Sequence, residues 1–301
     1  MTPAPTVRLA HFSDVHVTCR VRSWRREDWL SKRFSAWLNL RVLGRGRRFR
    51  HADEALRRLV DDAVARGVDH MVFSGDATAL GLEEEVAHAA ALLRVGERPG
   101  LAVPGNHDYC TPRDVREGHF ERYFSPWQQG ERVGEETYPF AQRVGPLWLI
   151  GVSSATPNRW AWDARGAVGA AQLERLERLL GRLEGGPRVL VTHYPVALAS
   201  GRGERRTRLL RDLARLIEVA ANGGVGLWLH GHRHDAYHLP AGELAPFPVI
   251  CAGSGTQTGR WSYGEYAITG RRLAARRRVY DPAAGAFADG EAFELELTGV
   301  G

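Results

Sequence analysis

The amino-acid sequence predicts an α/β domain that carries a functional site at the carboxyl ends of its strands. Five apolar, strand-like runs along the 301-residue chain end directly in polar clusters, and helix-like segments alternate with these runs. An apolar fraction of 44% is that of a globular protein with a sizeable core. Repeated succession of strand, polar cluster and helix is the pattern of an α/β sheet.

The expected elements follow one another without a repeat or a long linker, so we predict a single domain over residues 1–301. Helices are expected where apolar residues recur every three or four positions, over 51–66, 83–95, 112–123, 170–183 and 207–221. Strands are expected over 7–12, 68–73, 101–104, 138–143, 147–152, 188–192 and 225–229. The last part of the chain predicts antiparallel strands over 247–252, 262–269, 272–280 and 291–297.

Composition predicts a soluble, cytoplasmic protein. The sequence contains no run of about 18 apolar residues, the length needed for a membrane-spanning helix. Its first residues lead into a strand without an apolar signal segment. The three cysteines, Cys19, Cys110 and Cys251, are too few and too scattered for a disulfide framework, which suits a reducing compartment.

Residues 17–50, called the insertion below, interrupt the α/β rhythm with a basic, tryptophan-rich segment. From position 20 onward it holds eleven Arg or Lys side chains against Glu27 and Asp28, a net charge of +9, whereas the whole chain carries +6. A helical wheel places one broad apolar face on Trp29, Leu30, Phe34, Trp37, Leu38, Leu40 and Val42. Arg33 and Arg41 interrupt this face.

Three interpretations of the insertion stay open. Its apolar face packs on the protein body, or it contacts an anionic membrane surface or an acyl chain while its arginines face phosphate groups. The membrane interpretation places the cytoplasmic protein peripherally on the inner membrane. The third interpretation is nucleic-acid binding, because Trp and Arg also stack on bases. It is the weakest, since the sequence shows no separate nucleic-acid module.

The polar clusters at the strand ends contain side chains that bind metal ions. Seven candidate ligands are Asp14, His16, Asp76, Asn106, His193, His232 and His234. All offer oxygen or imidazole nitrogen, which suits Mn²⁺, Fe²⁺ or Zn²⁺ better than a structural zinc site. Seven ligands exceed the needs of one ion and suit two ions about 3.5–4 Å apart with one bridging carboxylate. The structural alternative makes Asp76 a helix N-cap and Asn106 a turn residue.

The order of these clusters resembles the calcineurin-like metallophosphoesterase family. Through about residues 7–260 the matching blocks are Asp14-x-His16, Gly75-Asp76, Gly105-Asn106-His107-Asp108, His193 and Gly231-His232-x-His234. The resemblance implies a four-layer α/β/β/α sandwich of two mixed β-sheets. It also implies hydrolysis of a phosphodiester or pyrophosphate bond by a hydroxide that bridges two divalent metal ions, with Mn²⁺ expected ahead of Fe²⁺ or Zn²⁺.

The same resemblance implies a role for each site residue. The first metal ion would be held by Asp14, His16, Asp76 and His234. The second would share the bridging Asp76 and take Asn106, His193 and His232. His107 resembles the family's non-ligand histidine, which stabilises the phosphoryl transition state or protonates the leaving oxygen. Asp108 would orient His107 by accepting a ring N–H.

The insertion resembles one subgroup of the family, the UDP-2,3-diacylglucosamine hydrolases, through residues 31–40 and the Arg-rich turn that follows. This resemblance implies a lipid-linked sugar nucleotide as substrate, with its pyrophosphate cleaved in lipid A synthesis. The candidate substrate-binding residues are Trp29, Arg33, Phe34, Trp37, Arg41, Tyr109, Arg202 and Arg206.

Other functions stay open beside the lipid substrate. A cyclic-nucleotide or general phosphodiesterase of the same family would act on a phosphorylated small molecule, with the insertion serving only as packing. A nuclease would use the basic surface of the insertion. A non-catalytic protein-binding scaffold is disfavoured, because all seven ligand residues are present. No protein partner is inferred.

Overall fold

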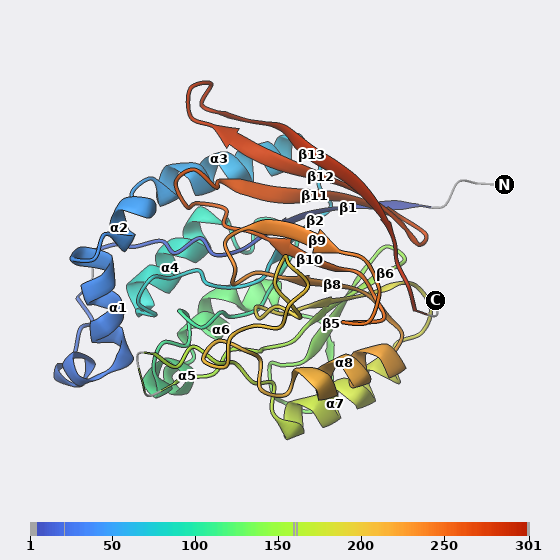
Figure 1. The fold of residues 1–301 in the computed structure, drawn as a ribbon, viewed down its shortest axis with the longest axis horizontal. Coiled ribbons are helices and arrows are strands. Elements are labelled where there is room, and N and C mark those ends of the chain that lie inside the picture. Colours follow the sequence, from blue (N-terminus) through green and yellow to red (C-terminus); the bar gives the residue numbers. More distant parts are fainter. Residues whose placement is uncertain (1–4, 21, 159, 161, 300–301) are drawn as a thin grey trace.

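A computed structural model of the chain describes residues 5–20, 22–158, 160 and 162–299. Two mixed β-sheets pack face to face, and helices cover the outer face of each sheet (Figure 1). Apolar side chains from both sheets, among them Leu9, Val72, Leu149 and Leu227, form the core between them. The predicted four-layer α/β/β/α sandwich is therefore confirmed.

The first sheet has the strand order β13-β12-β11-β1-β2-β3. The bounds of these strands, in that order, are Ala286–Glu296, Arg272–Asp281, Ser262–Thr269, Thr6–Phe12, His70–Phe73 and Gly100–Ala102. Strands β1, β2 and β3 are parallel, whereas β11 pairs with β1 in the antiparallel sense. Helices α3 (Ala52–Ala65) and α4 (Glu83–Leu92) bury their apolar stripes against the outer face of this sheet.

The second sheet has the strand order β4-β5-β6-β7-β8-β10-β9. The bounds in that order are Glu131–Arg132, Phe140–Val144, Leu147–Gly151, Arg188–Val191, Val225–His230, Val249–Ala252 and Ala236–Leu239. Side chains of β8 alternate, so that Leu227 faces the other sheet while Trp228 packs among the residues of the outer layer. Helices α7 (Ala170–Leu180) and α8 (Leu213–Asn222) form that layer.

Local backbone geometry explains where the expected helices differ from the observed ones. The segment expected as one helix over 112–123 forms α5 (Pro112–Glu117) and α6 (His119–Phe124), because Gly118 between them adopts a left-handed φ of 59°. Helix α8 begins only at Leu213, since the backbone of residues 207–211 pairs with that of residues 164–166 instead. The short strands β4 and β9 were not predicted.

The insertion forms a 3₁₀ helix (Arg26–Leu30), α1 (Lys32–Arg41) and α2 (Arg45–Arg48) at one side of the sandwich, on the left in Figure 1. The predicted single apolar face is wrong. Leu40 is buried against the body, whereas Leu30 is 96% exposed. The reason is that α1 starts only after Ser31, whose side chain accepts the N–H of Arg33, so the preceding residues lie on a different turn.

No helix within the described ranges is long and apolar enough to span a membrane.

Candidate metal centre

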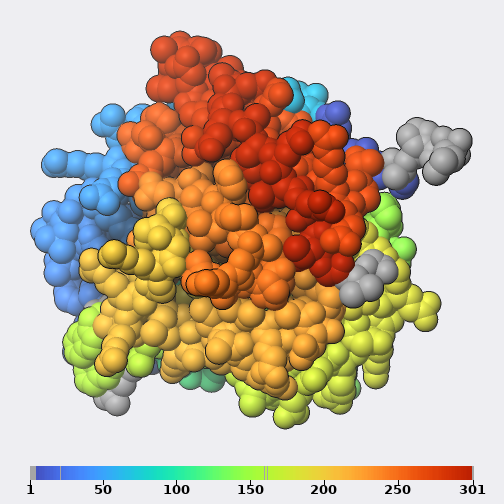
Figure 2. Space-filling model, turned by 45° about the vertical axis from the view of Figure 1, so that its right-hand side comes forward, coloured from blue at the N-terminus to red at the C-terminus, as the bar shows by residue number. Residues whose placement is uncertain are grey.

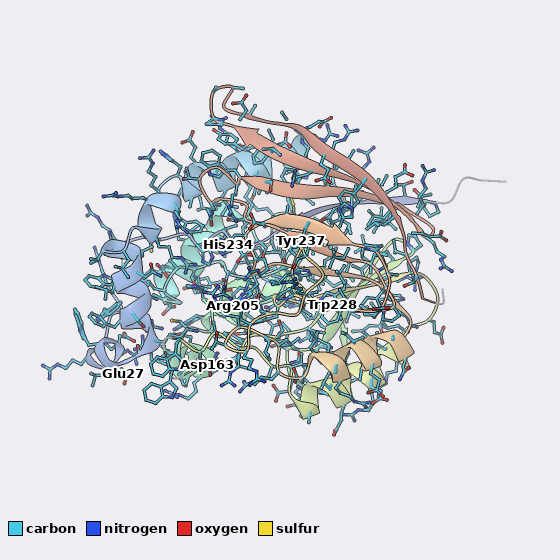
Figure 3. All side chains as sticks on the ribbon, viewed as in Figure 1. Glu27, Asp163, Arg205, Trp228, His234 and Tyr237 are labelled. Atoms are coloured by element: carbon cyan, nitrogen blue, oxygen red, sulfur yellow. The ribbon has the colours of Figure 1, made fainter. Side chains whose placement is uncertain are left out.

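Polar side chains that follow five strands meet at one edge of the sandwich. They come from the carboxyl ends of β1, β2 and β3 in one sheet and of β7 and β8 in the other. Parallel strands end at the same edge of their sheet, which brings side chains distant in sequence together. In Figure 3 His234 lies between the insertion, at the left, and Trp228 of β8. Leu43 and Arg45 of the insertion line one cavity with His234, so the insertion lies beside the edge that carries these residues.

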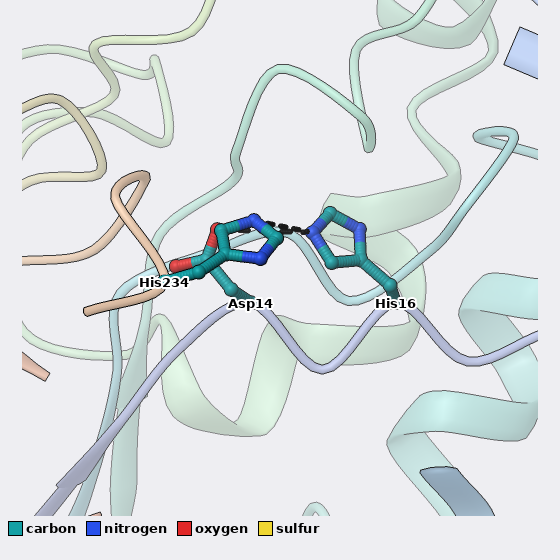
Figure 4. Close-up of side chains that lie close together, drawn as sticks. All are labelled: Asp14, His16 and His234. Atoms are coloured by element: carbon teal, nitrogen blue, oxygen red, sulfur yellow. Dashed lines mark hydrogen bonds and ion pairs between the residues drawn. The ribbon is translucent and has the colours of Figure 1, made fainter. Parts of the chain in front are cut away.

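The first predicted ligand group is assembled around the side chain of Asp14 (Figure 4). Its Oδ1 lies 3.2 Å from Nε2 of His234 and 3.7 Å from Nε2 of His16. The two imidazole nitrogens are 3.2 Å apart. Oδ2 of Asp76 lies 3.6 Å from His16 Nε2. Four donor atoms of the right chemical types thus converge on one small volume.

The second predicted ligand group shares the same atom of Asp76. Its Oδ2 lies 3.5 Å from Nε2 of His193, which in turn is 3.3 Å from Nδ1 of His232. Asn106 is 5% exposed and its Oδ1 has no hydrogen-bond partner in the described part of the chain. Because one carboxylate oxygen borders both groups, Asp76 occupies the position that a bridging ligand requires.

Backbone strain is concentrated in these residues. Five of them adopt a positive φ, between 41° and 71°: Asp14, His16, Asp76, His232 and His234. Among the other non-glycine residues described, only Arg94 does so. A Cβ on Gly105 would lie 2.1 Å from Asp76 Oδ1, and one on Gly231 would lie 1.8 Å from the hydroxyl of Ser13. Strain of about 1–3 kcal/mol per residue persists where a fold holds functional side chains in place.

The donor set fits divalent metal ions. Oδ1 of Asp14 is buried without a hydrogen-bond partner among the described residues, as is Oδ1 of Asn106. Burial raises the pKa of Asp14, but the neighbouring His234 outweighs burial and holds that pKa well below its usual range. Burial lowers the pKa of His16 and of His232. Ionised carboxylates and neutral imidazoles are the protonation states that ligate metal.

His193 differs from the other histidines of the centre. Burial alone would lower its pKa, but the Asp76 carboxylate outweighs burial and raises the pKa to about 9. In the metal-free chain a proton therefore lies between these two side chains. His193 must release that proton to act as a ligand, so metal binding at this position is coupled to proton release.

Comparison with known proteins identifies the family. A family model for calcineurin-like phosphoesterases matches residues 7–236, which is most of the chain. The chain belongs to this family. The predicted enzyme class, a metal-dependent phosphoester hydrolase, is thereby confirmed. No protein of curated function matches the sequence.

Solved structures share the fold of this phosphoesterase at low sequence identity. A dimetal phosphatase from Danio rerio has a TM-score of 0.66 and 12% identity, with 98% of this chain and 99% of that chain covered. Purple acid phosphatase PPD1 from yellow lupin has a TM-score of 0.61 and 12% identity over 97% of this chain and 54% of that one. PhoD has a TM-score of 0.58 and 9% identity, covering 99% and 71%.

His107 of the phosphoesterase points its ring at the metal centre, but Asp108 does not orient it as predicted. The Nδ1 of His107 lies 2.8 Å from the carbonyl oxygen of Ala79, and its ring centroid lies 4.7 Å from that of His16. The carboxylate of Asp108 instead accepts N–H groups of the loop that carries Asp76. Asp108 is therefore a positioning residue for the bridging carboxylate rather than for the histidine.

Arg33, predicted to contact substrate, is fully buried in the structure. Its guanidinium donates to Asp28 at 2.5 Å, to the carbonyl of Leu80 at 2.9 Å and to Asp114. Asp28 also accepts from Arg113. The prediction is wrong for Arg33, because buried charges need partners and this one has them within the protein. The residue fastens the insertion to the body.

The other predicted substrate-binding residues lie in a cavity, in the interior or on the surface. Trp29, Trp37 and Arg41 line a cavity of about 730 Å³ in the insertion, together with Trp24 and Leu40. The ring of Phe34 stacks on that of Trp37. Tyr109 is buried, and its hydroxyl donates to Glu121. Arg202 and Arg206 are exposed and line none of the described cavities.

Arg45 is a site residue that the sequence reasoning missed. Its Nη2 lies 3.2 Å from Nε2 of His16, one of the candidate ligand atoms. It begins the short helix α2 directly after Gly44, whose φ is 85°. The signal in the sequence is the Gly44-Arg45-Gly46 turn, because glycine permits the sharp reversal that sends this arginine back toward the strand ends.

Proposed function

We propose that this phosphoesterase binds two divalent metal ions, Mn²⁺ above all, and cleaves the pyrophosphate of UDP-2,3-diacylglucosamine. The observation that carries the lipid substrate is the tryptophan-lined cavity of the insertion. One solved structure that shares the fold over 99% of its own chain is named a dimetal phosphatase, which supports the proposal of two ions here.

The residues proposed to hold the first ion are Asp14, His16, Asp76 and His234. Those proposed for the second are Asp76, Asn106, His193 and His232. Bound divalent cations neutralise phosphoryl oxygens and lower the pKa of a coordinated water toward neutrality. The chain itself supplies a fixed array of ligand atoms, so that little reorganisation is needed when the phosphoryl group binds.

His107 is proposed as the proton donor to the leaving oxygen. With Nδ1 hydrogen-bonded to the carbonyl of Ala79, the opposite nitrogen is the one available to the substrate. Burial holds the pKa of His107 well below its usual range in the free protein. An anionic phosphoryl group bound beside the ring favours the protonated imidazole that a proton donor needs.

The cavity suits an apolar chain with a charged end. Trp24, Trp29 and Trp37 pack edge to face around it, and Leu80 lines it from the loop that follows Asp76. Arginines at its mouth complement phosphate or carboxylate oxygens. The cavity adjoins the metal centre through this loop, since Asp76 and Leu80 are four residues apart. An acyl chain here would leave its headgroup near the strand ends.

The test compares three substrates on the Mn²⁺-loaded protein: UDP-2,3-diacylglucosamine, cyclic AMP and an aryl phosphodiester. We expect the lipid nucleotide to give the highest kcat/KM. Turnover of cyclic AMP alone would refute the lipid substrate and favour the cyclic-nucleotide alternative. Trp37→Ala should raise KM for the lipid without changing that for the aryl ester. Trp162→Ala is the matched control, because Trp162 is 66% exposed and lies outside the cavity.

Contact with an anionic membrane is part of the proposal, because a diacylated substrate resides in a bilayer. Leu30 and Leu43 of the insertion are 96% and 71% exposed and stand among arginines. Exposed apolar side chains beside basic ones bind anionic interfaces. Co-sedimentation with phosphatidylglycerol vesicles, but not with phosphatidylcholine vesicles, is expected. If the wild type and a Leu30→Ser/Leu43→Ser variant sediment equally with phosphatidylglycerol vesicles, the proposed contact between the insertion and the membrane is refuted.

A further inference from the structure

A second cavity, of about 320 Å³, opens beside His232 and His234. Its lining includes five arginines from four segments of the chain: Arg45, Arg48, Arg208, Arg233 and Arg260. Figure 2 shows the loop near residue 208 (yellow) next to the insertion (blue), in agreement with their shared cavity. No acidic side chain is among the residues that line it.

Only two of these arginines have carboxylate partners. Arg233 pairs with Glu204 at 3.0 Å, and Arg260 pairs with Asp235. Arg45, Arg48 and Arg208 form no ion pair with any residue that the structure describes. Three guanidinium groups that lack a carboxylate ion-pair partner repel one another, and an anion between them would relieve that repulsion.

The position of Arg45 relates this cavity to the metal centre. Its guanidinium lies 3.2 Å from His16 Nε2, a nitrogen proposed to bind metal. The guanidinium of Arg45 and a metal ion bound by His16 would both be positive. Their close approach is favourable only with an anion between them. Arg45 is therefore placed to contact the phosphoryl group that the metal centre holds.

We propose that Arg45, Arg48 and Arg208 bind a second phosphate of the substrate, adjacent to the phosphate that is cleaved. This inference rests on the proposed hydrolase function and assigns the residues that would recognise the second phosphate of its pyrophosphate substrate. A cyclic nucleotide or a simple phosphodiester carries one phosphate and would leave Arg48 and Arg208 unpaired. Arginine suits such a site, because its fork of N–H donors matches phosphate oxygens.

Isothermal titration calorimetry tests the site by comparing inorganic phosphate with inorganic pyrophosphate. The full-length protein is loaded with Mn²⁺, and free Mn²⁺ is held constant. We expect pyrophosphate to bind at least about tenfold more tightly than phosphate, the effect of one or more charge-assisted hydrogen bonds. The Arg48→Ala/Arg208→Ala variant should lose most of that preference, whereas Arg45→Ala should weaken the binding of both anions.

Arg47→Ala is the matched control, because Arg47 lies on the same helix α2, is exposed and does not line this cavity. It should keep the preference for pyrophosphate. An absence of preference in the wild type would overturn the inference, as would an equal loss in Arg47→Ala and in the double variant. A protein that prefers pyrophosphate but does not cleave UDP-2,3-diacylglucosamine would refute the proposed substrate and still support the arginine site.

Discussion

The metal centre and the insertion are fixed in the molecule by different kinds of contact. The centre is built from the ends of five strands in two sheets, with buried side chains and a backbone shaped around them. The insertion is attached to one side of the sandwich by side-chain contacts: the buried Arg33 network, the bonds of Ser23 and Glu27 to the body, and the apolar contacts of Leu40 and Phe49. The centre is thus supported by the whole sandwich, whereas the position of the insertion depends on its side chains.

The largest effect is expected at Asp76, the carboxylate that borders both ligand groups. Asp76→Asn should lower turnover of an aryl phosphodiester by more than the roughly 10²–10⁴-fold contribution of a general acid. It should also lower the bound metal, measured by elemental analysis, and chelation of the wild type should abolish activity. Near-normal turnover and metal content in the variant would refute the two-metal assignment.

His107→Asn tests whether His107 is a metal ligand or a proton donor. A loss on the order of 10²–10⁴-fold in kcat is expected, with the metal content unchanged. The donor atoms of His107, His16 and Asp76 lie within 4.8 Å of one another, so the geometry also permits ligation by His107. A fall in metal content in this variant would make His107 a ligand instead of a proton donor.

Arg33→Leu should disturb the insertion and leave the metal centre intact. Removing one partner of a buried ion pair costs about 3–5 kcal/mol, because Asp28 and Asp114 lose their counter-charge. Chemical denaturation measures this loss. We expect the variant to lose activity on the lipid nucleotide while it still cleaves a small aryl ester. Arg26→Ala, an exposed change on the same segment, should alter stability by less than about 0.5 kcal/mol.

Glu85 lies where the insertion meets the body. It is expected to have a smaller effect, on the pH dependence of the free energy of unfolding. It lines the tryptophan cavity, and burial raises its pKa from 4.5 to about 8. The folded state therefore holds the proton more tightly than the unfolded state. Its contribution to stability is fully present below pH 4.5 and is lost as the pH rises through 8.

Glu85→Gln removes this titration. Its free energy of unfolding relative to wild type should rise between pH 5 and pH 8, by at most about 1.4 kcal/mol per pH unit. Glu84→Gln is the control: burial raises the pKa of Glu84, but hydrogen bonds from Ser23 and Arg22 outweigh it and lower the pKa below 4.5, so its difference from wild type should not change between pH 5 and pH 8. A difference for Glu85→Gln that does not change with pH would show that Glu85 is ionised in the folded protein.

Much of the fold and of the centre could be predicted from local sequence patterns. Apolar runs revealed the strands, and polar residues such as Asp14 and His193 followed directly at their ends. The structure brings six of the seven candidate ligands within 3.7 Å of another member of the set, and Asn106 is buried, its Oδ1 without a hydrogen-bond partner among the residues described. Their binding of metal stays a prediction. The role of Asp108 was misjudged, because its partners are backbone N–H groups about 30 residues earlier in the chain. Side-chain identity alone does not reveal such partners.

The sequence by itself predicted an α/β fold from its apolar runs and, through the family resemblance of its strand-end motifs, the four-layer architecture and the reaction class. These motifs are short segments and can be read without the fold. Only the tertiary structure decided where the arginines of the insertion lie. It paired Arg33 with Asp114, 81 residues away, and placed Arg45 beside His16 and near Arg208. The sequence marks every arginine of this region as basic. Whether a guanidinium is buried with a carboxylate or left facing a cavity depends on how distant segments pack.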